Sequence, residues 1–155
     1  MIEARVTMKG GNATVELAGD LLGTDAKPLA ELAAKLAGAK AVRFDLEHLG
    51  MMNSAGVMDW AGFLEKLPCP YVFVSCPVDF VDYANLVPQV IGEGRVETFY
   101  APLRCSPCKV GQTTLLEAAK LTPESDFGSM ACPKCGKAME PEVEPADYFT
   151  FLFED

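Results

Sequence analysis

The sequence predicts a mixed α/β domain, in which helices pack on a β-sheet, followed by a small module built around four cysteines. Over the first hundred residues, alternating apolar and polar positions typical of strands take turns with stretches of helical periodicity. After these, two Cys-x2-Cys pairs occur within a short segment. The chain has 155 residues, 50% of them apolar, which is enough for a hydrophobic core and one small extra module.

The first elements are a pair of strands and a helix. Strands are expected at residues 3–9 and 13–18, because apolar residues alternate with polar ones and Gly10-Gly11-Asn12 supplies a hairpin turn. A helix is expected at residues 25–38, with Thr24 or Asp25 as its cap. Its leucines fall on one face at helical spacing, which indicates a helix that lies on a core.

Strands and helices continue to alternate up to residue 100. Further strands are expected at 41–46, 71–74 and 95–100, and further helices at 54–66 and 78–86. The run Tyr71-Val72-Phe73-Val74 is continuously apolar, which is typical of a central strand covered on both faces. Because the composition changes near Pro102, we expect a domain at 1–101 and a module at 102–155.

Three segments of the first domain resemble the STAS domain, the fold of anti-sigma factor antagonists and of sulfate-transporter tails. They are Val15–Leu21, Val42–Leu46 and Met52–Val57, in the order and spacing of that family. The resemblance implies a mixed sheet with packed helices. It also implies a partner-binding surface at the start of the second helix, which would include four residues: Met52, Asn53, Ser54 and Ala55.

The third segment departs from the family pattern at two positions. In members switched by an anti-sigma kinase, the phosphorylated residue stands immediately before the glycine, where this chain has Ala55. Asn53 replaces the usual aspartate, and Ser54 matches the preceding serine. Ser54 therefore has two interpretations, as a helix N-cap or as a phosphorylation site. Asn53 is interpreted as a turn or cap residue.

The two Cys-x2-Cys pairs predict a metal site. They are Cys105–Cys108 and Cys132–Cys135, with 23 residues between them. Two such turns at this separation are typical of a tetrahedral four-thiolate centre, and Gly136 would let the second turn close. The module resembles a zinc ribbon or a rubredoxin-like knuckle, which implies structural Zn²⁺, with iron as the alternative. Four thiolates saturate the ion and leave no position for a substrate.

Charge and composition narrow the choice of partners and compartment. The chain has 13 basic and 22 acidic residues, a net charge of −9, which disfavours binding to nucleic acid or to an anionic membrane surface. No signal peptide or membrane-spanning segment is expected, so the location would be cytoplasmic. In that compartment Cys69 and Cys76 should stay reduced, outside any disulfide.

The aromatic segment at 147–155 can be interpreted as a strand or as a short helix, and either form must be covered. It would pack on the rest of the chain, or contact a partner or a second copy in a homodimer.

No catalytic constellation stands out in the sequence, so a non-enzymatic regulatory protein is expected. The resemblance implies an anti-sigma factor antagonist in a partner-switching pathway, with an anti-sigma factor or kinase-like partner. One alternative is a constitutive accessory subunit of a transporter or other complex, which Ala55 would suit. The other is a zinc-ribbon protein that binds nucleic acid.

Overall fold

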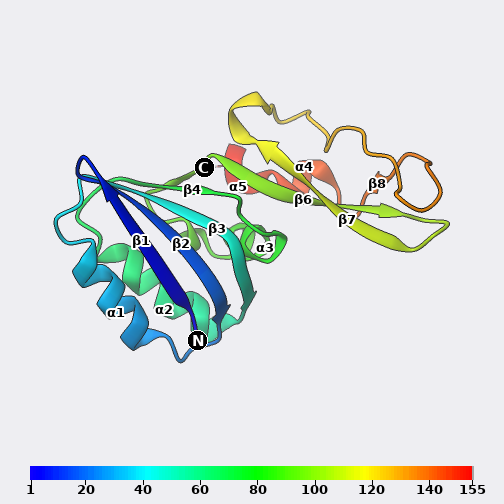
Figure 1. Ribbon diagram of the computed structural model, residues 1–155. Helices are drawn as coiled ribbons and strands as arrows, with labels where there is room; N and C mark the ends of the chain where they lie inside the picture. The colour runs from blue at the N-terminus through cyan, green and yellow to red at the C-terminus, as the bar shows by residue number, and fades with distance from the viewer. Residues whose placement is uncertain (155) are drawn as a thin grey trace.

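The computed structural model describes residues 1–154 and contains a five-stranded and a three-stranded sheet (Figure 1). The first sheet has the order β1-β2-β3-β4-β5, with β1 antiparallel to β2 and the remaining pairs parallel. Its strands are β1 (Glu3–Lys9), β2 (Asn12–Leu21), β3 (Ala41–Met52), β4 (Tyr71–Val74) and β5 (Arg95–Val96). The predicted mixed α/β fold class is confirmed by this topology.

Three helices connect the parallel strands: α1 (Ala26–Lys35), α2 (Ser54–Glu65) and α3 (Val78–Leu86), followed by the short helix η1 (Pro88–Val90). Right-handed crossovers between adjacent parallel strands place successive helices on one face of a sheet. Figure 1 shows α1 and α2 side by side beneath the sheet. Between them and the strands, the rings of Phe44, Trp60 and Phe73 form an aromatic core. The Trp60 Nε1–H donates to the Val90 carbonyl oxygen at 2.9 Å, so its polar atom is satisfied.

No described helix packs on the opposite face of the five-stranded sheet. Along β2, exposed residues such as Thr14 and Glu16 alternate with buried ones, which is the pattern of a sheet covered on one side. The expectation that β4 is covered on both faces was wrong. Val72 and Val74 are only half-buried, because the helices pack on the other face.

The strand expected at 95–100 is divided between the two sheets. β5 ends at Val96, and β6 (Thr98–Cys105) begins the second sheet, whose order is β7-β6-β8. Its other strands are β7 (Val110–Glu117) and β8 (Glu140–Pro141), with a short helix η2 (Ala118–Lys120) after β7. Cys76, which follows β4, links the two sheets through β6. Its N–H donates to the Thr98 carbonyl oxygen at 3.2 Å, and its carbonyl oxygen accepts from the Tyr100 N–H at 2.8 Å.

The C-terminal segment is helical, so the strand alternative was wrong. It forms two short helices, α4 (Pro145–Tyr148) and α5 (Thr150–Phe153). Buried Tyr148 and Phe149 pack against Phe99 of β6. On the other side, the Asn85 amide of α3 donates to the Tyr148 carbonyl oxygen at 3.0 Å and accepts from the Phe151 N–H at 2.8 Å. The tail therefore joins the second sheet to α3.

Candidate functional site

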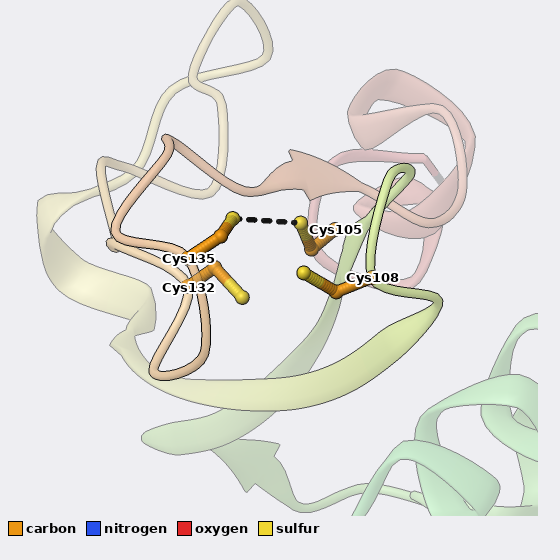
Figure 2. Close-up of side chains that lie close together, drawn as sticks. All are labelled: Cys105, Cys108, Cys132 and Cys135. Atoms are coloured by element: carbon orange, nitrogen blue, oxygen red, sulfur yellow. Dashed lines mark hydrogen bonds between the residues drawn. The ribbon is translucent and has the colours of Figure 1, made fainter.

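The four cysteines of the two Cys-x2-Cys pairs converge (Figure 2). Their Sγ atoms all lie within 4.8 Å of one another, and the Cys105 and Cys135 sulfurs are 3.6 Å apart. This separation is far longer than a disulfide bond of about 2.05 Å. Four sulfurs at about 2.3 Å from a tetrahedral ion stand about 3.8 Å apart, so the cluster has the size of a four-thiolate metal site.

Two tight turns of similar construction present these sulfurs. In the first, the Lys109 N–H donates to the Cys105 carbonyl oxygen at 2.8 Å, and in the second the Gly136 N–H donates to the Cys132 carbonyl oxygen at 2.9 Å. Both donor residues have positive φ, 55° for Lys109 and 75° for Gly136. The turn role of Gly136 was expected from the sequence, whereas the equivalent lysine carried no such signal.

The four cysteine thiols can all lose their protons only if a bound cation balances the negative charge of the thiolates. The Cys135 backbone N–H, aimed at the Cys132 sulfur, lowers the pKa of that thiol to about 7. A hydrogen bond with the Cys135 sulfur, together with burial, raises the pKa of Cys108 to about 12. Four thiolates this close repel one another strongly, so metal binding must displace protons. Cys105 and Cys132 are buried and Cys135 is exposed, so an ion can enter from the Cys135 side.

The other two cysteines lie outside this cluster. Both are free cysteines, Cys69 partly exposed and Cys76 buried. Cys76 is fully buried, and burial raises the pKa of its thiol, so it stays protonated and unreactive.

The start of α2 is fixed by Asn53. Its backbone is extended (φ −135°, ψ 177°), and its side-chain oxygen accepts a hydrogen bond from the Gly56 N–H at 2.8 Å. Its side-chain nitrogen donates to the Leu22 carbonyl oxygen at 3.1 Å, which ties the helix to the end of β2. Asn53 is therefore the N-cap, as one interpretation expected. The interpretation of Ser54 as the cap was wrong, because Ser54 is already the first helical residue.

Gly56 allows α2 to start this close to β2. A Cβ atom at this position would stand 1.8 Å from the Leu21 carbonyl oxygen and 2.2 Å from the Leu21 carbonyl carbon. Backbone atoms cannot move aside as a flexible side chain can, so the close approach requires glycine.

Exposed side chains surround this helix start. Ser54 and Ala55 are exposed, Met51 and Met58 are 60% and 71% exposed, and Leu22 is 39% exposed. Met52, expected at the same surface, is only 8% exposed, and its carbonyl oxygen accepts from the Tyr83 hydroxyl at 3.3 Å. The α2 cap surface is defined here as Leu22, Met51, Asn53, Ser54, Ala55 and Met58.

Replacing Asn53 by alanine is expected to lower the free energy of unfolding by about 1 to 2 kcal/mol, because the helix loses its cap. Ser54→Ala is the matched control, since no described hydrogen bond uses the Ser54 side chain, and it should change stability by less than about 0.5 kcal/mol. Urea unfolding of both variants checks this. Equal losses would contradict the assignment of the cap to Asn53.

This chain is similar to known proteins in its three-dimensional structure. No known protein family and no curated protein sequence was found to match the chain. One similar solved structure is an anti-sigma factor antagonist from Mycobacterium paratuberculosis, with 20% identity and a TM-score of 0.49, covering 57% of this chain and 79% of that one. Another is the anti-sigma factor antagonist SpoIIAA in its unphosphorylated form, with 14% identity and a TM-score of 0.46, covering 61% of this chain and 87% of that one.

The described helices are too short or too polar to cross a bilayer. None of them combines the length and the apolar character that crossing a bilayer requires.

Proposed function

We propose that this chain is a non-enzymatic regulatory protein of the cytoplasm that binds a protein partner through the α2 cap surface. It would act as an anti-sigma factor antagonist does in a partner-switching pathway. The observation that carries the proposal is the group of exposed apolar side chains around a capped helix start. Residues 1–101 would supply this surface, and residues 102–155 would form a zinc ribbon.

The chemistry of the α2 cap surface suits protein contact. Methionine side chains are flexible and polarisable, so Met51 and Met58 can adapt to an apolar partner. Exposed apolar residues that gather in one place, bordered by polar ones, are typical of interaction sites. Ser54 lies at the positive end of the α2 dipole, where a phosphate would add roughly −1.5 to −2 charges to the contact. A kinase could therefore reverse binding without refolding the protein.

The metal of this proposal is Zn²⁺ with a structural role, and iron is the alternative ion. The four cysteines supply all four ligands of a tetrahedral site, so the ion would hold two chain turns together and would not bind a substrate. Between η2 and β8, residues 121–139 contain no regular helix or strand in the described chain, so this loop depends on the ion for its shape.

One observation favours a second candidate function. Ala55 occupies the position that family members use as phosphoacceptor, and it cannot be phosphorylated. If Ser54 is not modified either, the same surface would bind its partner constitutively, as in an accessory subunit of a transporter or other complex.

An affinity capture with matched variants tests the proposed surface. Zinc-loaded wild-type protein, Met58→Lys and Met8→Lys are each immobilised, and proteins captured from the native cells are identified by mass spectrometry. Met8 is also an exposed methionine (48%), but it lies on β1, away from the α2 cap surface. We expect a protein partner that is retained by wild type and Met8→Lys and lost by Met58→Lys.

The identity of the captured protein separates the two functions. An ATP-binding anti-sigma factor that also phosphorylates Ser54 would support the partner switch. A transporter subunit or another protein whose binding is independent of ATP would favour the accessory role. Equal capture by all three proteins, or capture by none, would contradict binding through the α2 cap surface.

A further inference from the structure

β7 is an edge strand whose outer side no other described strand covers. Its one neighbour is β6, in a sheet of the order β7-β6-β8. Over residues 110–116 it has the sequence Val-Gly-Gln-Thr-Thr-Leu-Leu, with no charge and no proline. Exposed edges usually carry lysine, proline or a bulge, which prevent pairing with another chain. The β7 edge lacks these features, which makes it open to strand addition.

The register shows which backbone groups of β7 face outward. Pro102 of β6 lies opposite Thr113, and its carbonyl oxygen accepts from the Glu142 N–H at 3.0 Å, on the side away from β7. Pro102 and Thr113 therefore form a non-hydrogen-bonded pair, and the N–H and C=O of Thr113 point away from β6. The direction of the backbone N–H and C=O groups alternates from one residue to the next along a strand. The backbone groups of Gly111 and Leu115, two residues from Thr113 on either side, therefore also point outward. All three residues are exposed.

We propose that this edge pairs with β7 of a second copy of the chain, antiparallel and centred on Thr113. Thr113 would then meet Thr113 of the partner subunit, and Gly111 would meet Leu115 of the partner subunit. The outward N–H and C=O groups of these residues would all be used, and two three-stranded sheets would become one continuous sheet. Such a two-fold contact closes on itself and gives a dimer without further growth.

The charges at the ends of the strand select this register. With Thr113 on the two-fold axis, Lys109 of each subunit lies opposite Glu117 of the partner subunit, since the two residues are equally distant from Thr113. The Glu117 side chain is 55% exposed and so remains accessible beside its own Lys120, 3.1 Å away. Between Lys109 and Glu117 the strand carries no charged residue, so no like charges would face each other across the contact. Leu115, which is 48% exposed, would lie beside a glycine, which leaves room for its side chain.

The test uses a charge placed on the two-fold axis. Thr113→Lys brings two lysines directly opposite each other in the dimer and leaves each monomer with one more exposed charge. Sedimentation velocity of the zinc-loaded proteins at a series of concentrations gives the mass in solution. We expect a wild-type dimer, and a dissociation constant that rises roughly tenfold or more for Thr113→Lys and for Thr113→Glu. An equal mixture of the two variants should form heterodimers, because the charges are then opposite.

Hydrogen exchange of the unmodified protein provides a second measurement, independent of how the variants fold. The amides of Gly111, Thr113 and Leu115 should exchange slowly at high protein concentration and quickly on dilution. A monomeric wild-type protein at high concentration would overturn the proposal. A dimer that both variants leave intact, with these three amides unprotected, would also overturn it.

Discussion

Removal of the metal is expected to unfold the residues around the four cysteines while the five-stranded sheet stays folded. Only a few backbone hydrogen bonds close the two cysteine turns in the described chain, and the loop at 121–139 buries few side chains, chiefly Phe127, Cys132 and Met139. Structural zinc contributes roughly 10 to 16 kcal/mol in zinc-finger peptides, which is as much as the whole stability of a typical domain. Hydrogen exchange before and after chelation should show protection lost at 105–139 and retained in β2, β3 and α2.

Cysteine variants separate this effect from a general loss of stability. Cys132→Ser removes a buried ligand and should lower the zinc content from about one ion per chain to well below half. Cys69→Ser is the matched control, because Cys69 is a free, partly exposed cysteine outside the cluster, and it should retain the ion. Elemental analysis after dialysis measures both. Full zinc content in Cys132→Ser would contradict the four-thiolate site.

The second large effect is expected from Gly56→Ala. The new methyl group would overlap the Leu21 carbonyl group, so α2 must move away from β2 and the Asn53 cap must break. Overpacking of this kind typically costs about 1 to 3 kcal/mol, and loss of the cap adds about 1 kcal/mol, so a loss of about 3 kcal/mol is expected.

Gly62→Ala is the control for this substitution, since both glycines lie in α2. A Cβ atom at Gly62 meets no atom within 4 Å, so alanine should stabilise the helix by about 0.5 to 1 kcal/mol. Urea unfolding gives both values. If Gly56→Ala and Gly62→Ala changed the free energy of unfolding by the same amount and in the same direction, the close contact between α2 and β2 would be contradicted.

Local signals predicted much of the fold and the site. The spacing of Cys105, Cys108, Cys132 and Cys135 was enough to expect their convergence, because two Cys-x2-Cys turns at this separation are typical of a four-thiolate site. The helices α1, α2 and α3 followed from periodic apolar residues between proline and glycine stops, and each lies within a few residues of its expected range.

Features set by distant contacts were not predictable. The strand expected at 41–46 continues to Met52, because β2 provides a partner along its whole length through two register shifts. Asn53, and not Ser54, caps α2, and its side chain also donates to the distant Leu22 carbonyl oxygen, a contact that the local sequence does not reveal. The helical form of the tail depends on Asn85 and Phe99, which lie about fifty residues or more away in the sequence.

Native mass spectrometry of the protein purified from its own cells is the decisive experiment for a zinc-bound regulator that binds a protein through the α2 cap surface, because it records metal, phosphate and bound protein together. We expect one zinc ion per chain and a bound protein partner that is absent when Met58→Lys replaces the wild type. A chain without metal under reducing conditions, or a partner that Met58→Lys retains, would contradict it.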